Sequence, residues 1–166
     1  MAETVKETIF DEGDIDQPVK DYPWIVFSLN GSEYGVNSKY VLSIEILGEI
    51  TPIVDAQHHC PGITRSRGNM IELLDLRALF GLGDYLSAKP QEQDERYMMV
   101  VIETDDVKRG LIVDQIVSVE HITRFDKGVI NTGQSVVTSK YVSQIAMREK
   151  MDTPLLIIDP VKLNEN

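Results

Sequence analysis

Histidine and cysteine, which often bind transition metals or act in catalysis, are rare in this chain, with three His and one Cys, and three of the four are consecutive in His58-His59-Cys60. Imidazole nitrogens and thiolates are the usual ligands of zinc. Consecutive residues on an extended backbone point to opposite faces, so these three side chains are poorly placed to share one ion. His121 is the only other histidine. We therefore expect no metal site and interpret the segment as a polar turn before Pro61-Gly62, with Cys60 a small, partly buried side chain.

Paired carboxylates are the second arrangement that could do chemistry, as a general acid and base. Asp105-Asp106 and Asp11-Glu12 lie in turn-like or acidic contexts, where Asp usually bonds to its own backbone. Asp75 and Asp159 each end an apolar run before a short helical segment, which predicts helix N-caps. The glycine patterns of phosphate loops, dinucleotide sites and hydrolase nucleophile elbows are absent from the sequence. These observations favour a protein that is not an enzyme and needs no cofactor.

Composition and charge exclude further classes. The chain has 166 residues, of which 42% are hydrophobic, which suits one domain or two small ones. Its formal net charge of −11 argues against a nucleic-acid partner and against docking on an anionic membrane. The longest apolar run, Tyr97–Ile102, is far too short to cross a bilayer, and the first residues lack a secretory signal. We expect a cytoplasmic protein with no direct membrane insertion.

Residue usage predicts an all-β fold. Val, Ile and Thr together number 43 against five Ala, and β-branched side chains suit a pleated, half-buried surface. Asn30-Gly31 is a strong hairpin signal between two strand-like runs. The predicted strands are 24–29, 33–36, 70–74, 97–103, 109–113, 116–122, 141–147 and 154–158. Two short helices are expected, one after an N-cap at Ser38 and covering Lys39–Leu42, the other from Asp75 to Gly81.

Three polar stretches organise the chain around these elements. Residues 1–21 carry seven acidic and two basic side chains with few apolar ones, which predicts a flexible acidic N-terminal tail. Residues 83–96 and 126–140 show neither helical nor strand periodicity, and we expect long loops there. The folded part of the chain is therefore expected to begin near residue 22.

An internal repeat is visible when Gly35-Val36 is placed on Gly110-Leu111. Without gaps, Ser43 then falls on Ser118 and Glu45 on Glu120. The segments 70–79 and 153–163 also match, since each is an apolar strand that ends in Asp before a short helix. The pattern predicts two related small β-barrels. Chance likeness between β-strands is the alternative, and the shared strand–Asp–helix ending argues against it.

The run from Gly62 to Arg77, GITRSRGNMIELLDLR, resembles the signature of the CheW family, the adaptor proteins of bacterial chemosensory arrays. The closing Leu79-Phe80-Gly81-Leu82 fits the same pattern. Further blocks match in order over 22–163, at 27–29, 33–36, 50–52, 110–114 and 155–159. The resemblance implies two five-stranded SH3-like β-barrels packed together with one or two short helices, in agreement with the repeat.

The resemblance also implies a function and its partners. CheW-like proteins couple the cytoplasmic tips of chemoreceptors to a CheA-type histidine kinase, docking on a kinase regulatory domain of the same double-barrel fold, and they catalyse nothing. Carried over to this chain, the receptor-binding positions are Val41, Ser43, Gly62 and Arg67. Core packing is the alternative for Val41 and turn capping the alternative for Arg67. The resemblance assigns no kinase-binding residue here.

The chain departs from the family pattern on the receptor-facing segment. Arg65-Ser66 replaces the usual Asn-Leu, Glu72 replaces a proline, and Ser43 stands where the family often has an acidic residue. These departures allow a specialised adaptor of another chemosensory array, such as one governing type IV pilus motility. A small-barrel ligand-binding or enzyme domain with unrecognised active residues is the alternative from a different class. A deep polar pocket would favour that alternative, whereas an exposed docking surface favours the adaptor.

Overall fold

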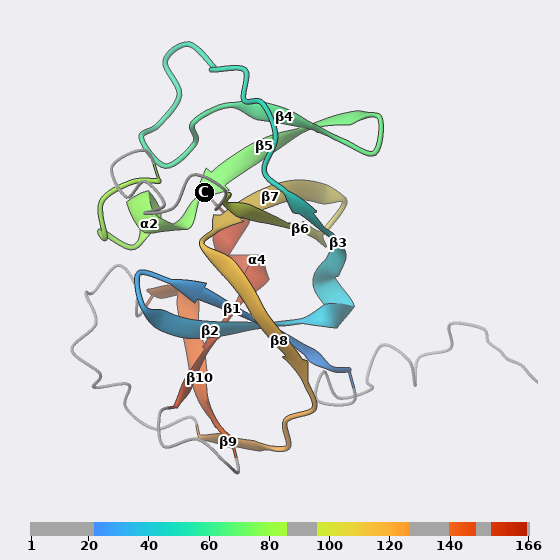
Figure 1. Cartoon of the computed structure of the whole chain (residues 1–166), viewed down its shortest axis with the longest axis vertical. Coiled ribbons are helices and arrows are strands. Elements are labelled where there is room, and N and C mark those ends of the chain that lie inside the picture. Colours follow the sequence, from blue (N-terminus) through green and yellow to red (C-terminus); the bar gives the residue numbers. More distant parts are fainter. Residues whose placement is uncertain (1–21, 86–95, 127–139, 149–153, 166) are drawn as a thin grey trace, which may run out of the picture.

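The computed structural model describes residues 22–85, 96–126, 140–148 and 154–165. The predicted acidic tail lies outside this range, as do most residues of the two predicted long loops. The described residues form two β-sheets that lie one above the other, with a few short helices beside them (Figure 1). The prediction of an all-β fold in two parts, with a few short helices, is thus confirmed.

The two sheets differ by one strand. Sheet B has five strands in the order β3 (Val41–Ile46), β6 (Met98–Thr104), β7 (Val107–Val113), β5 (Asn69–Asp75) and β4 (Ile63–Ser66). Sheet A has six, in the order β8 (Gln115–Glu120), β1 (Trp24–Leu29), β2 (Ser32–Asn37), β11 (Leu155–Ile158), β10 (Val142–Met147) and β9 (Arg124–Asp126). The sixth strand is the three-residue β9, which the sequence pattern did not predict, and β4 was missed as well.

The predicted repeat is present, and strands of its two copies pair with one another in both sheets. Each copy begins with a hairpin, β1–β2 or β6–β7, followed by a third strand, β3 or β8. β3 pairs with β6 of the other copy, and β8 pairs with β1 of the other copy. The later strands β11 and β5 then pair in parallel with β2 and β7. Each sheet therefore combines the hairpin of one copy with the remaining strands of the other copy: sheet A joins β1 and β2 to β8, β9, β10 and β11, and sheet B joins β6 and β7 to β3, β4 and β5.

The two glycines that align the repeat hold equivalent places in the sheets. Gly35 pairs with Ile157 and Gly110 with Leu73, each across a parallel strand pair. A β-carbon on Gly35 would lie 2.9 Å from Leu155 Cδ2, and one on Gly110 would lie 2.5 Å from the Met99 sulfur. Glycine is needed at both positions because the neighbouring side chains pack over the bare backbone.

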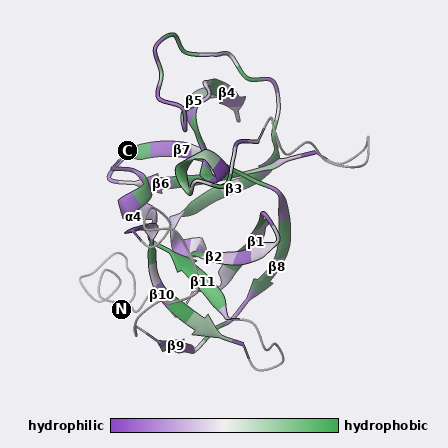
Figure 2. Cartoon of the chain, turned by 90° about the vertical axis from the view of Figure 1, so that its left-hand side faces the viewer, coloured by the Kyte–Doolittle hydropathy of each residue, from purple (hydrophilic) through white to green (hydrophobic). Residues whose placement is uncertain are grey.

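Three apolar clusters hold the sheets. The largest lies between them and includes Phe27, Tyr34, Leu74, Phe80 and Ile158. A smaller one covers the other face of sheet A and another the other face of sheet B. Because alternate residues of one strand serve opposite faces, β11 is buried on both sides and is apolar throughout, as its colour shows (Figure 2).

The segment predicted as a helix after Ser38 forms only a 3-10 turn, η2 (Ser38–Tyr40). Its N-cap is Asn37, whose side chain accepts the Lys39 N–H at 2.9 Å. From Val41 onward the chain is in β3. The prediction of a helix reaching Leu42 was wrong, because pairing with β6 overrides a weak local helix signal.

The two predicted aspartate caps are confirmed. Asp75 accepts backbone N–H groups at the start of α2 (Leu76–Leu79), and Asp159 does the same for α4 (Pro160–Leu163). Both caps follow the last strand of their repeat copy. The strand–Asp–helix ending seen in the sequence is therefore a real element of the repeat.

Each of these helices reaches across to the hairpin of the other sheet. In α2, the Arg77 guanidinium bonds to both carboxylate oxygens of Asp114, at 2.6 and 3.0 Å, and to Asn30 Oδ1 at 3.2 Å in the β1–β2 turn. After α4, the Asn164 amide donates to Thr104 Oγ1 at 2.6 Å and to the Val107 carbonyl at 3.3 Å, beside the β6–β7 turn. One inter-sheet contact is thus a charged pair and the other a neutral amide.

Candidate functional site

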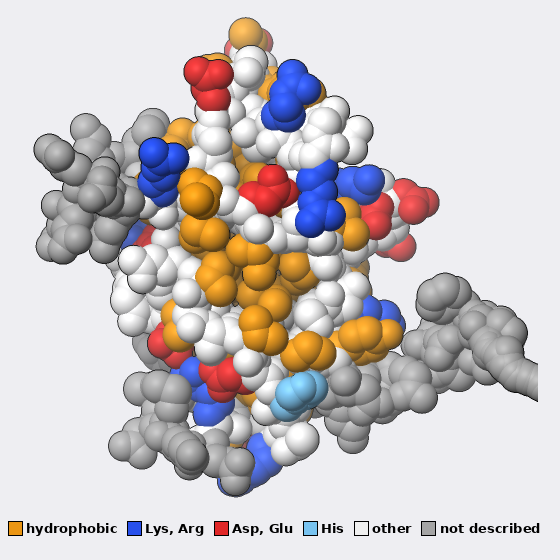
Figure 3. Space-filling view, turned by 45° about the vertical axis from the view of Figure 1, so that its right-hand side comes forward, with side chains coloured by type: hydrophobic (Ala, Val, Ile, Leu, Met, Phe, Trp, Pro, Cys, Tyr) orange, Lys and Arg blue, Asp and Glu red, His pale blue; other side chains and the backbone are white. Residues whose placement is uncertain are grey.

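β3 and β8 are equivalent in the repeat. Both are edge strands, and they carry much of the exposed apolar surface. Sheet B ends at β3 and sheet A ends at β8, and both strands lie on the same side of the molecule (Figure 1). Figure 3 shows hydrophobic side chains gathered across the middle of this side. We call the exposed side chains of these two strands the apolar band: Leu42 (45% exposed), Ile44 (36%), Ile46 (57%), Val117 (46%) and Val119 (57%). Exposed apolar surface of this extent usually marks a site for a protein partner.

A cavity of about 220 Å³ adjoins the apolar band at Leu42. A larger one, of about 330 Å³, lies away from the band, in sheet A. We call the smaller one the Arg67 pocket. Its polar walls carry two cations and three hydroxyl or amide groups, and its lining is Leu42, Ser43, Ser66, Arg67, Asn69, Ile71, Val101 and Lys108. Arg67 and Lys108 are both exposed, so the mouth of the pocket is basic. Such a mouth attracts a carboxylate.

The backbone that presents Arg67 is unusual. Arg67 and Gly68 form the two-residue turn between β4 and β5, with φ angles of 50° and 84°. This turn requires positive φ at both positions and normally places Asn or Asp before Gly. A long cationic side chain in the left-handed region is unfavourable by about 1–2 kcal/mol. A residue that is unfavourable for its own turn is often kept for what its side chain does, which favours a functional role for Arg67.

Glu45 stands beside this turn and is held in place by two hydroxyl groups. Its Oε2 accepts from Ser43 at 2.7 Å and from Ser66 at 2.6 Å. The pKa of Glu45 is lowered from its ordinary value, first by the Ser66 bond, next by the Ser43 bond, and also by the charge of Arg67, against the opposing effect of burial. Glu45 therefore remains ionised and fixes the serines that line the pocket.

The four predicted receptor-binding residues fall into two groups. Ser43 and Arg67 line the same pocket. Val41 is half-buried against the core between the sheets, as its alternative interpretation had it. Gly62 is buried, and a β-carbon there would lie 2.2 Å from the Thr51 carbonyl oxygen, so glycine is required by packing alone.

Sequence reasoning missed Glu45 as a member of this site. It was aligned with Glu120 in the repeat, and strand alternation places it on the same face as Ser43. No sequence signal could have joined it to Ser66, which lies on β4. β3 and β4 are the two opposite edge strands of sheet B, so that contact forms only because the sheet curls until its edges meet.

The departure at Glu72 has a local partner. Its Oε1 accepts from Arg109 Nη2 at 2.7 Å, across the parallel pair of β5 and β7. His59 lies near this pair, and its pKa is lowered by burial first and then by the charge of Arg109. Among the described residues, no three His, Cys, Asp or Glu side chains are grouped so that they could hold a metal ion. None of the described helices is long and apolar enough to cross a membrane.

Comparison with known proteins identifies the fold and the family. The model of the CheW-like domain family matches residues 23–166. The chain is 23% identical to the chemotaxis protein CheW of Klebsiella aerogenes, over 84% of this chain and 80% of that protein. It is 30% identical to the chemotaxis protein CheW of Bacillus subtilis over 91 residues, 55% of this chain and 54% of that protein.

A solved structure agrees with these matches. The scaffolding protein TtCheW from Thermoanaerobacter tengcongensis superimposes with a TM-score of 0.68 and 26% identity, covering 83% of this chain and 88% of that one. The match includes both sheets, and the family match spans both repeat copies. On this evidence the chain belongs to the CheW-like domain family.

Proposed function

We propose that this protein is a non-catalytic chemosensory adaptor that couples chemoreceptors to a CheA-type histidine kinase. Family membership and the names of its relatives support the class. The observation that carries the receptor contact is the apolar band with a basic pocket at its edge, on the exposed edge strands of the two sheets.

The surface suits a receptor segment that is apolar along one face and acidic beside it. The apolar band supplies area that is removed from water when a partner docks. Arg67 and Lys108 supply the orientation, because complementary charge at the rim of an interface favours one register and speeds encounter. Two adjacent cations also stand out in a protein whose net charge is −11.

The kinase partner is expected at another face of the double sheet. In this proposal the regulatory domain of the kinase binds away from β3 and β8, so that receptor and kinase are held at the same time. The adaptor then works in the cytoplasm and is recruited to a membrane-associated receptor array.

A specialised array, such as one that controls type IV pilus motility, is a second candidate for the pathway. The observation that favours it is Ser66, which stands where the family has leucine and donates to Glu45. The receptor-facing pocket is therefore more polar than the family pattern implies, and a receptor with a matching polar group would be selected.

The test is Arg67→Glu, with Arg65→Glu as the matched control. Both arginines are exposed and belong to the β4–β5 hairpin, but only Arg67 lines the pocket. We expect Arg67→Glu to weaken receptor binding at least tenfold, or about 1.4 kcal/mol, and to change the free energy of unfolding by less than about 1 kcal/mol. Kinase binding should be unchanged, and Arg65→Glu should have little effect on any of the three.

The measurements are both affinities and thermal unfolding for each variant. Loss of folding in Arg67→Glu would assign the arginine a structural role. Intact receptor binding by a folded Arg67→Glu variant would show that the receptor is held elsewhere, and would remove the basic pocket from the proposal.

A further inference from the structure

The ends of the two repeat copies are equivalent in the chain but different in their surroundings. In sheet B, Asp75 caps α2 and is 1% exposed. Its Oδ2 also accepts the backbone N–H of Tyr85 at 3.1 Å. In sheet A, Asp159 caps α4 by accepting the Val161 N–H at 3.0 Å through Oδ1, and it is only half-buried.

In sheet B the chain itself covers the capping aspartate. After α2, residues 81–85 turn back over the end of the sheet, and the Tyr85 ring meets the Tyr97 ring edge-on, with centroids 5.9 Å apart. Both tyrosines pack against the apolar cluster on the outer face of sheet B. A backbone N–H and one aromatic ring therefore close this end.

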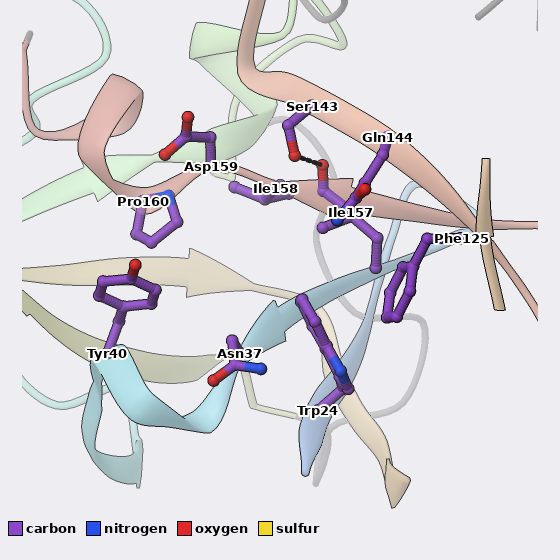
Figure 4. Close-up of a pocket in the computed structure, with 10 residues that line it drawn as sticks. All are labelled: Trp24, Asn37, Tyr40, Phe125, Ser143, Gln144, Ile157, Ile158, Asp159 and Pro160. Carbon is purple, nitrogen blue, oxygen red and sulfur yellow. Dashed lines mark hydrogen bonds between the residues drawn. The ribbon is translucent and has the colours of Figure 1, made fainter. Parts of the chain in front are cut away.

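In sheet A the corresponding place is an open cavity of about 330 Å³, which we call the aromatic pocket. Figure 4 shows Trp24, Tyr40 and Phe125 around it, with Asp159 and Pro160 at one side. The remaining lining residues are Asn37, Ser143, Gln144, Ile157 and Ile158.

Two aromatic residues at this end of sheet A differ in their surroundings from the equivalent residues at sheet B: Trp24, which lines the pocket, and Tyr22, whose carbonyl accepts from the lining residue Asn37 at 3.5 Å. The repeat places Tyr22 on Tyr97, and Tyr22 is 38% exposed with no aromatic contact among the described residues. Trp24 is 4% exposed, yet its indole N–H has no hydrogen-bond acceptor in the described part of the chain. A buried donor without an acceptor is unfavourable, and native proteins rarely leave one so.

We propose that the aromatic pocket docks a short segment of a partner protein that carries an aromatic side chain. The segment binds as residues 81–85 bind at the other end of the molecule: its ring packs on Phe125, its backbone N–H donates to Asp159, and one of its carbonyl groups accepts from Trp24 Nε1. Aromatic anchors in such pockets are typical of protein interfaces. The site shares no residue with the Arg67 pocket, so it is separate from the proposed receptor contact.

A peptide with the sequence of residues 81–85 can serve as a probe of the aromatic pocket. A capped peptide of residues 81–85, GLGDY, carries the groups that close the end of sheet B, and GLGDA lacks the ring. Trp24 is the only tryptophan, so a ¹⁵N-labelled full chain gives one indole N–H resonance that reports on the pocket. We expect GLGDY to shift this resonance to saturation with a dissociation constant on the order of 1 mM, and GLGDA to leave it unchanged.

The key variant is Asp159→Asn. Asparagine remains a good N-cap, so α4 is retained, but an amide nitrogen replaces the second acceptor oxygen. We expect GLGDY to bind about tenfold more weakly, a change that corresponds to loss of a charge-assisted hydrogen bond. Glu49→Gln is the control, because it removes one exposed carboxylate on the other half of the molecule and should bind the peptide like the unchanged protein.

Thermal unfolding of each variant shows whether it is folded. If Asp159→Asn does not fold, Phe125→Leu replaces it, since this change keeps apolar volume and removes the ring that the peptide contacts. The proposal is overturned if GLGDY causes no shift at 5 mM, if GLGDA binds equally well, or if a folded variant of either kind binds GLGDY like the unchanged protein. None of these outcomes depends on receptor binding. The adaptor proposal is tested separately, by Arg67→Glu.

Discussion

Glu45 on β3 and Glu120 on β8 occupy equivalent positions in the repeat, but different side chains stabilise their charges in sheet B and in sheet A. Each carboxylate accepts from a serine two residues earlier, Ser43 or Ser118. Glu120 also meets Arg148, an arginine whose side chain is 5% exposed and which bonds to Glu33 as well, at 2.7 Å. In sheet A the cation is therefore part of the interior.

In sheet B the corresponding partner of Glu45 is the Ser66 hydroxyl, and the nearby arginine, Arg67, points out of a strained turn. The hydroxyls satisfy the carboxylate, which leaves the guanidinium available to a partner. In our proposal, the same strand ending serves stability in sheet A and recognition in sheet B. Removing the buried arginine should cost folding free energy, and removing the exposed one should cost binding.

The largest effect is expected at the contact between the halves. Arg77→Ala removes a guanidinium that is bonded to both oxygens of Asp114, so that this carboxylate keeps the Asn30 N–H but loses its cation, and we expect a loss of about 3–5 kcal/mol in the free energy of unfolding. Asn164→Ala, at the equivalent neutral contact, should cost only about 0.5–1.5 kcal/mol. Urea denaturation of the two variants measures both, and equal losses would show that charge makes no difference between the contacts.

The next comparison concerns the core between the sheets. Leu74 and Ile158 are equivalent in the repeat, 0% and 1% exposed, and lie in the same apolar cluster. We expect Leu74→Ala and Ile158→Ala each to cost about 2–5 kcal/mol, because both leave a cavity in a closely packed interior. Denaturation midpoints measure this. An unchanged midpoint for either variant would contradict the two-sided packing of β5 and β11.

Arg148→Ala and Ser66→Ala test the difference between the two carboxylates. The first variant removes a buried cation from Glu33 and Glu120 and should cost about 1.5–3 kcal/mol, whereas the second removes one hydroxyl donor and should cost about 1 kcal/mol. Chemical denaturation measures both. A larger loss of unfolding free energy for Ser66→Ala than for Arg148→Ala would contradict this difference, because the contact of Glu45 would then be the more stabilising one.

The smallest expected effect is on pH dependence. Burial, followed by the charge of Arg109, lowers the pKa of His59 below its ordinary value, so the fold favours the neutral ring. The stability that this gives is complete above about pH 6.5 and is lost as the pH falls through the lower pKa of the folded state. We expect the free energy of unfolding to fall less between pH 7 and 5.5 in His59→Gln than in the unchanged protein. His121→Gln, at an exposed position, is the control and should keep the original slope in the same titration.

Sequence reasoning succeeded where structure is local. The Asn30-Gly31 hairpin, the Asp75 and Asp159 caps and the repeat at Gly35 all depend on residues close together in the chain, and all are present. It failed at β3, where a short helix was predicted, because the strand exists only through its pairing with β6. The same limit hid the site: Glu45 and Ser66 meet through tertiary structure, and nothing in either segment indicates the other.

The domain boundary and the receptor roles of Val41, Ser43, Gly62 and Arg67 came from the family resemblance and stay predictions. For Ser43 and Arg67 the structure adds a shared pocket and a strained backbone as reasons. For Gly62 it adds a steric reason instead, so that glycine would be needed there even in a protein without a receptor.

The pairing of strands between the two repeat copies affects how the chain folds during synthesis. When residues 24–46 have left the ribosome, the β1–β2 hairpin can form, but β8, which pairs with β1, has not yet been made. β6, which pairs with β3, has not been made either. β2 in turn pairs with β11, so the strands of the first copy keep unpaired edges until residue 158 has been made. Expressed as two separate polypeptides, the copies should each stay unfolded alone and assemble only with one another, which makes the domain a natural candidate for a split reporter of adaptor assembly.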